Sequence, residues 1–117
     1  DGQQSRCFTY IGDVVPALIT LMDRPEVNGQ VFNVGSNQRV TIEALARRVI
    51  ERTGSSSSLV FVPYDEAYGP GYEDMRHRAP DLTKIHRAIG YEPKTELDEI
   101  LDAVIADIRG RIARGVE

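Results

Sequence analysis

The stretch Arg76-His77-Arg78-Ala79-Pro80-Asp81 places two arginines shortly before a predicted helix. Arginine can bind a phosphate or carboxylate group through two parallel hydrogen bonds, so this stretch is a candidate anion-binding segment. The alternative is that both arginines are ordinary surface residues that pair with the nearby carboxylates of Glu73 and Asp74. Isolated surface pairs of that kind contribute little energy.

Local signals define the helix that follows these arginines. Pro80 favours an extended backbone at the residue before it. Asp81 is a good N-cap for a helix over residues 82–89, and Gly90 is suited to end that helix. Since Asp81 would occupy the free N–H groups of the helix end, an anion bound here would have to be held by the arginine side chains.

Length and composition indicate a globular protein. The 117 residues suffice for one compact domain, with 41% hydrophobic and 27% charged residues. The net charge of −4 argues against binding to nucleic acid or to an anionic membrane surface. Cys7 is the single cysteine, so an internal disulfide is excluded. No apolar run approaches the length of a membrane span, and we expect a cytoplasmic protein.

Hydrophobic periodicity and capping residues predict three further helices. Asp13 is suited to cap a helix over residues 14–23, with Pro16 tolerated in its first turn. Thr41 is expected to cap a second helix that ends at Gly54. Thr95 is expected to cap the last helix, in a capping box with the acidic residue three positions later.

Short apolar runs predict strands at residues 8–11, 31–34 and 59–62, the last continuous enough to be buried. The fold class is therefore α/β, with about four helices and three or four short strands in an incomplete sheet. Residues 63–80 show no periodicity, and loops of that length often act as lids or bind ligands. Asp1-Gly2 is typical of a hairpin turn but follows no strand, so the chain looks like part of a longer protein.

No complete set of catalytic residues is present. The glycines fit neither a dinucleotide-binding nor a Walker spacing, and no tyrosine has a lysine four residues later. With two histidines, His77 and His86, a multi-histidine metal site is excluded. The carboxylates at positions 65, 66, 73 and 74 could form an acid/base pair, but a solvated acidic loop explains them as well.

Four motifs occur along the chain in a recognisable order. Residues 1–13 read DGQQSRCFTYIGD, and VFNVGS at 31–36 is followed by TIEALA at 41–46. RAPD at 78–81 is followed by IGYEP at 89–93 and then by the closing amphipathic helix. This order resembles the C-terminal portion of extended short-chain dehydrogenases of the NAD-dependent epimerase/dehydratase family, which act on nucleotide sugars. The pattern is most similar to the UDP-glucuronate decarboxylase and UDP-glucose 4-epimerase branch.

The resemblance implies roles for three residues. In that family the arginines matching Arg6 and Arg78 bind the diphosphate of the substrate, and the residue matching Gln4 lies near the nucleotide. Arg76 has no clear counterpart, and residues 68–74 depart from the family's usual R-x-G-D pattern, which leaves the substrate class open.

The resemblance also implies that residues 1–117 form the nucleotide-sugar-binding region of a parent enzyme. The N-terminal NAD-binding domain and the catalytic tyrosine and lysine would lie outside this chain. We therefore expect the parent to bind NAD and a nucleotide sugar, most simply a UDP-linked one. The chain alone is expected to bind no NAD and to be inactive.

Two other functions remain open from the sequence. The chain could be a stand-alone, non-catalytic module that binds a nucleotide or sugar phosphate, or a structural fragment without a ligand. Under the leading hypothesis, the helix at 14–23 is apolar on several faces and the strand at 31–34 has few local partners. Such surfaces favour association, so we expect self-association.

Overall fold

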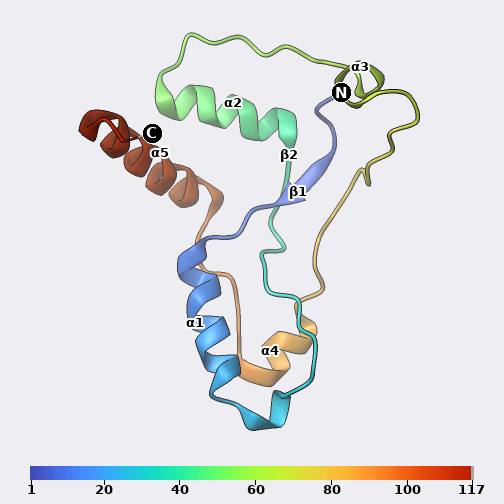
Figure 1. Cartoon of the computed structure of the whole chain (residues 1–117), viewed down its shortest axis with the longest axis vertical. Coiled ribbons are helices and arrows are strands. Elements are labelled where there is room, and N and C mark those ends of the chain that lie inside the picture. Colours follow the sequence, from blue (N-terminus) through green and yellow to red (C-terminus); the bar gives the residue numbers. More distant parts are fainter. Residues whose placement is uncertain (117) are drawn as a thin grey trace. The chain divides into compact units, whose positions relative to one another are not determined.

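The computed structural model describes residues 1–116. In this part of the chain it contains five α-helices, one 3₁₀-helix and two short strands (Figure 1). In chain order these are β1 (Ser5–Cys7), α1 (Ile11–Met22), η1 (Pro25–Val27), β2 (Arg39–Thr41), α2 (Ile42–Thr53), α3 (Tyr64–Tyr68), α4 (Thr83–Ile89) and α5 (Leu97–Arg114). The α/β class is confirmed, whereas the predicted number of strands was too high. No helix in the described range is long and apolar enough to cross a membrane.

The chain is divided into two compact units. The first unit comprises residues 1–6 and 39–78, and the second comprises residues 7–38 together with the chain from residue 79 onward. Each unit is therefore assembled from segments that are distant in the sequence.

In the first unit, β1 and β2 form a two-stranded sheet, and β2 leads directly into α2 (Figure 1). The predicted cap of α2 is confirmed, because the Thr41 hydroxyl accepts a hydrogen bond of 3.1 Å from Ala44 N. The predicted end is confirmed as well, because Gly54 takes the left-handed conformation that glycine adopts easily, with φ of 67°. These local signals determine where α2 begins and ends. Because β2 leads directly into α2, they also determine where β2, the partner of β1, ends.

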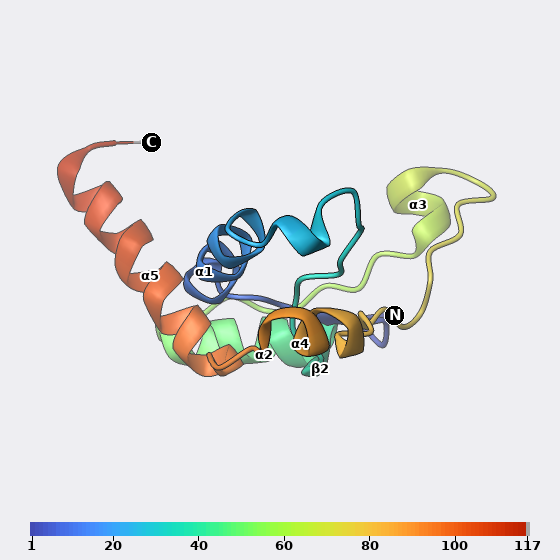
Figure 2. The same ribbon diagram turned by 90° about the horizontal axis from the view of Figure 1, so that it is seen from below.

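Two sequence predictions for the first unit were wrong. The predicted buried strand at residues 59–62 is not formed, and Val60 is 80% exposed. An apolar run becomes a strand only where a neighbouring strand completes its hydrogen bonds. The segment predicted to lack regular structure contains the short helix α3, which Figure 2 shows as a single compact coil between extended chain segments.

The core of the second unit is formed by Ala17, Ile85 and Tyr91, where α1 and α4 contact each other (Figure 1). Phe32 and Val34 pack against this core. The predicted strand at residues 31–34 is nevertheless not formed. The prediction of a strand was wrong, because the segment has no strand to pair with in the described part of the chain.

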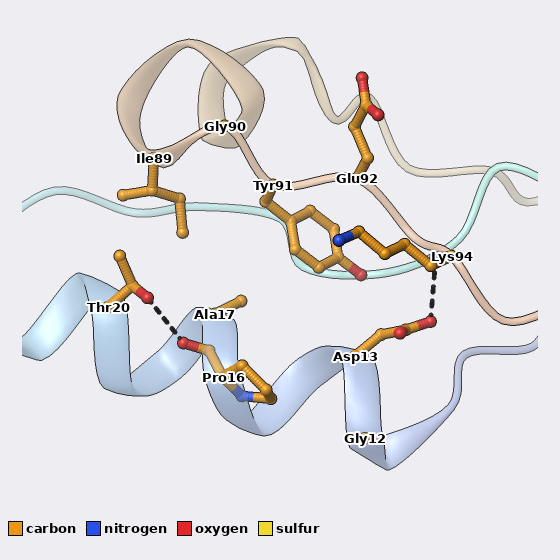
Figure 3. A pocket seen from close by; sticks show the side chains of 10 residues that line it. All are labelled: Gly12, Asp13, Pro16, Ala17, Thr20, Ile89, Gly90, Tyr91, Glu92 and Lys94. Carbon is orange, nitrogen blue, oxygen red and sulfur yellow. Dashed lines mark hydrogen bonds between the residues drawn. The ribbon is translucent and has the colours of Figure 1, made fainter.

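The start of α1 differs from the prediction. The helix begins at Ile11, with Tyr10 in extended conformation as its N-cap, so the predicted strand over residues 8–11 is not formed. Asp13 lies in the first turn and does not cap the helix. Its carboxylate instead accepts a hydrogen bond from Lys94 N at 3.1 Å (Figure 3). It accepts a second from Thr95 N at 3.0 Å. Pro16 consequently lies inside the helix.

The predicted N-caps of α4 and α5 were each wrong by one residue. The N-cap of α4 is Leu82 and not Asp81, because α4 begins at Thr83, one residue later than predicted. Asp81 accepts a hydrogen bond of 2.8 Å from Thr83 N. Gly90 ends α4 with φ of 71°. The capping box of α5 is formed by Glu96 and Glu99 and not by Thr95 and the residue at position 98, because Thr95 N is already bonded to Asp13.

Candidate nucleotide site

The segment that carries Arg76 and Arg78 lies directly beside β1 in the first unit. Ser5 and His77 form a parallel β-bridge. Ser5 N donates to Arg76 O at 2.7 Å, and Arg78 N donates to Ser5 O at 3.3 Å. The structure thus brings together two segments whose proximity the sequence could not establish.

This bridge determines which side chains share a face. Paired residues of a bridge point to the same side, and side chains alternate along extended backbone. Ser5 and His77 therefore point to one side, where the Ser5 hydroxyl and His77 Nδ1 are 2.9 Å apart. By this alternation the residues that follow them, Arg6 and Arg78, are neighbours along the paired backbone and fall on the opposite side. Gln4, which precedes Ser5, lies on that same side.

Arg6 is held in place by several acceptors. Its Nη1 donates to Ser5 O at 2.7 Å and to Met75 O at 2.9 Å, and its Nη2 donates to the Asp74 carboxylate. The side chain is 20% exposed and that of Asp74 is 22% exposed. Arg6 is therefore a partly buried, oriented guanidinium and not a solvated surface residue.

The other two arginines are more accessible. Arg76 Nη2 donates to the Asp1 carboxylate at 2.8 Å, in a pair whose side chains are 67% and 54% exposed. Its partner is thus not one of the two carboxylates suggested by the surface-residue alternative. Arg78 is exposed.

A pocket of about 360 Å³ lies on the first unit and includes Gln4. The Oε1 atom of Gln4 is buried and, among the described residues, receives no hydrogen bond. Tyr64 and Tyr72 line the pocket with rings 5.5 Å apart, and Tyr68 stacks on Tyr72 at 4.5 Å. Asp1, Glu73, Asp74 and Arg76 complete the lining.

Sequence reasoning missed this tyrosine cluster, although a signal was present. Tyr64 and Tyr68 are four residues apart, the spacing that aligns side chains on one face of a helix, and both lie in α3. Tyr72 lies beyond the end of α3, so no local spacing indicated its contact with the other two rings.

The second unit has a pocket of about 230 Å³ between α1 and the segment after α4 (Figure 3). The ring of Tyr91 borders it, and the Tyr91 hydroxyl donates to Gly35 O at 2.7 Å. Burial, and then the nearby charge of Asp13, raise the pKa of Tyr91 against the opposing effect of the bond to Gly35. The motif residues Asp13, Gly35 and Tyr91 thus form structural bonds in this unit.

The described residues contain no group of three or more histidine, cysteine, aspartate or glutamate side chains that could hold a metal ion. Of the candidate ligand-binding residues Gln4, Arg6 and Arg78, Gln4 lines the pocket, whereas Arg6 and Arg78 lie on the two backbone segments joined by the Ser5–His77 bridge.

The chain is similar in sequence to enzymes that act on nucleotide sugars. Residues 1–104 match the family model for GDP-mannose 4,6 dehydratase. A UDP-N-acetyl-alpha-D-glucosaminuronate decarboxylase of Bacillus cytotoxicus is 38% identical over 105 residues, which cover 90% of this chain and 32% of that protein.

Solved structures show the same similarity. UDP-glucose 4-epimerase of Thermotoga maritima, solved with UDP-glucose, has a TM-score of 0.81 and 30% identity, covering 96% of this chain and 34% of that one. UDP-glucuronic acid 4-epimerase of Bacillus cereus, solved with UDP-glucuronic acid and NAD, has a TM-score of 0.74 and 25% identity, covering 88% and 31%. The chain spans about a third of the length of the relatives it matches.

Proposed function

The chain belongs to the NAD-dependent epimerase/dehydratase family, through its match to the GDP-mannose 4,6 dehydratase model, and we propose that it is the C-terminal, nucleotide-sugar-binding part of a longer enzyme. The relatives named above act on, or are bound to, UDP-linked sugars. A UDP-linked sugar is therefore the proposed substrate. The proposed cofactor is NAD, which is present in the Bacillus cereus epimerase structure.

The observation that carries this proposal is the position of Arg6 and Arg78. They follow the paired residues Ser5 and His77 on adjoining backbone segments, and the alternation of extended backbone assigns both to the same face. Two guanidinium groups that reach the same ligand can bind and offset the charge of one diphosphate. Arginine is better suited to this than lysine, because its planar fork binds two oxygens at once.

The pocket beside Arg76 is the proposed place for the nucleoside. Gln4 offers a buried acceptor oxygen that receives no hydrogen bond from residues 1–116, and a buried polar atom is costly to leave unpaired. A nucleobase can supply an N–H donor to that oxygen. The rings of Tyr64 and Tyr72 provide flat apolar surface against which a base can stack.

The chemical step is assigned to residues outside this chain. Its 117 residues contain no glycine-rich dinucleotide loop and no tyrosine–lysine pair at the spacing used for proton transfer in this family. We therefore assign NAD binding and catalysis to an N-terminal domain of the parent enzyme. This region would bind the nucleotide end of the substrate.

Calorimetric titration of the full-length enzyme with UDP and with uridine tests the proposal. Arg6→Ala and Arg78→Ala should each weaken UDP binding by about ten- to a hundredfold, as expected for the loss of a charge-assisted contact. Arg76→Ala should have a smaller effect. Lysine at position 6 or 78 should restore binding only in part.

Uridine separates a phosphate contact from a general loss of structure, because it has no phosphate and should bind the Arg6 and Arg78 variants nearly as well as the unsubstituted protein. Arg24→Ala is a charge-matched control, since Arg24 pairs with Glu26 in an exposed position and should not affect UDP affinity. Unchanged UDP affinity in a folded Arg78→Ala variant would refute the diphosphate assignment.

A further inference from the structure

We propose that α5 carries an interface through which two copies of this protein associate, with their α5 helices packed antiparallel. The interface consists of the α5 stripe, which is Val104, Ile108 and Ile112, and of the charged pair Asp107–Arg111 beside it. It lies on the second unit, and the proposal does not depend on the nucleotide site of the first unit.

The α5 stripe is exposed although its side chains are apolar. Val104, Ile108 and Ile112 are 47%, 50% and 71% exposed, whereas Leu97, the first residue of the same helix, is buried. Residues four apart lie on one face of a helix, so the three side chains form one continuous row. A continuous exposed apolar row is typical of a surface that contacts a partner.

Most of the stripe lies beyond the region that the chain shares with the family model. That model matches residues 1–104, whereas α5 continues to Arg114 as one uninterrupted helix (Figure 2). Ile108 and Ile112 therefore lie past the matched residues. The family match does not account for the apolar character of these two positions.

The spacing of the stripe fits a partner that is identical to it. The two copies of a homodimer are usually related by a two-fold axis, so the contact surface must be complementary to itself. If two α5 helices run antiparallel about an axis at Ile108, this residue faces its own counterpart. Val104 then lies level with Ile112 of the other copy, because each is four residues from the axis. All three side chains of both copies are thereby covered.

The charges beside the stripe favour the same orientation. Asp107 and Arg111 lie on one edge of the stripe and pair at 2.8 Å, with exposed side chains. In an antiparallel pair this edge faces itself, and Asp107 lies two residues, or about 3 Å along the axis, from Arg111 of the other copy. Exposed charges of this kind contribute little energy, but they select one orientation over another. On the other edge, Arg109 already has an interaction partner within its own chain.

The dimensions of α5 indicate a weak dimer. Its 18 residues span about 27 Å. Interfaces that bury less than about 1,200 Å² in total belong to weak or transient complexes, and three apolar side chains from each copy place this interface in that class. We therefore expect association that increases with protein concentration.

Disulfide cross-linking of the full-length protein tests the arrangement. The variants are made in a background in which Cys7 and any other cysteine are replaced by serine. Ile108→Cys alone should form a disulfide-linked dimer under oxidation, because the axis brings the two copies of this position together. Val104→Cys and Ile112→Cys should each fail to cross-link alone, but the two proteins should cross-link with each other when mixed.

Helix geometry makes this pattern diagnostic. A disulfide requires Cα atoms within about 7 Å of each other. In the antiparallel pair, position 104 of one copy lies eight residues, or about 12 Å, from position 104 of the other. A parallel pair would instead cross-link each single variant and not the mixture. That result, or the absence of a cross-link in every variant, would overturn the proposal.

Sedimentation equilibrium of the full-length protein provides a second test. Ile108→Asp should weaken one association step by at least about tenfold, because two carboxylates would meet at the centre of the interface. Ala106→Asp is the matched control, since it adds the same charge at an exposed position on the other side of α5 and should leave association unchanged. Equal weakening by both variants would contradict the proposal.

The same variants separate a second copy from another occupant of the stripe. If the N-terminal part of a longer chain covered the stripe, Ile108→Asp would lower the stability of the protein and leave its association unchanged. That outcome would also overturn the proposal.

Discussion

Substitution of Asp13 by asparagine should destabilise the second unit through two identified hydrogen bonds. One carboxylate oxygen of Asp13 accepts a hydrogen bond from Lys94 N at 3.1 Å (Figure 3). The same oxygen accepts another from Thr95 N at 3.0 Å, so the first turn of α1 is bonded to the residues before α5. Asp13→Asn retains an acceptor oxygen of the same size and removes the charge. Asp13→Ala removes the acceptor altogether.

The expected loss follows from the strength of these bonds. A hydrogen bond to a charged group contributes about 1.5–3 kcal/mol, compared with about 0.5–1.5 kcal/mol for a neutral one. Asp13 is partly exposed, so water screens part of this difference. Replacing the charged acceptor by the neutral one of Asp13→Asn should cost about 1 kcal/mol for the two bonds together. Asp13→Ala leaves both N–H groups without this acceptor and should cost about 2–3 kcal/mol.

The pH dependence provides an independent check. Burial acts to raise the pKa of Asp13, but hydrogen bonds from Thr95 and Lys94 and the charge of Lys94 outweigh it and lower the pKa below its ordinary value of 3.8. The folded state therefore binds this proton more weakly than the unfolded state. The contribution of the carboxylate is complete above pH 3.8 and is lost as the pH falls through the lowered value.

Urea denaturation followed by circular dichroism would measure both effects. Asp13→Asn should be less stable near neutral pH, and the difference from the unsubstituted protein should shrink in acid. Asp107→Asn is the matched control, because Asp107 pairs with Arg111 on an exposed helix face and should change stability by less than about 0.5 kcal/mol. If Asp13→Asn and the unsubstituted protein have equal urea midpoints near neutral pH, or if their difference in stability grows in acid, the Asp13 carboxylate does not stabilise the fold as proposed.

Three other predictions concern the isolated chain. Tyr91→Phe should cost about 1–2 kcal/mol in urea denaturation, because it leaves the buried Gly35 carbonyl without its donor; an unchanged midpoint would contradict this. The chain should show no saturable NAD binding in calorimetry, and a measurable affinity would contradict the assignment of NAD to another domain. It should also self-associate in light scattering, because α1 exposes Leu18, Ile19 and Met22; a single monomeric species at high concentration would count against this.

Local chemistry explains which parts of the fold could be predicted from sequence. Thr41, Gly54 and Gly90 act on backbone atoms within a few residues of themselves, so their capping roles were predicted and are confirmed. Asp13 was equally suited to capping by its residue type. Its carboxylate instead bonds backbone N–H groups more than 80 residues away, a contact that no local pattern indicates.

The strand predictions failed because a strand forms only where a second segment pairs with it, and composition does not show which segments pair. The apolar runs at 31–34 and 59–62 have the composition of strands, but neither is paired in the described part of the chain. β2, which does pair, comprises the three residues Arg39–Thr41 and lacks an apolar run. Its composition therefore gave no signal of its pairing with β1.

The candidate site shows the same limit. Sequence motifs selected Gln4, Arg6 and Arg78, but they could not show that Arg6 contacts Asp74, 68 residues away, or that Ser5 contacts His77, 72 residues away. Those contacts arise from the path of the chain after α3.

The most direct test of the central claim is a crystal structure of the full-length protein with UDP. If Arg6 and Arg78 bind the diphosphate, phosphate oxygens should lie within about 2.7–3.0 Å of guanidinium nitrogens of both residues, the usual length of a charge-assisted hydrogen bond. The base should lie in the pocket lined by Gln4 and Tyr72. A diphosphate bound elsewhere, with both guanidinium groups out of hydrogen-bonding reach, would contradict the account.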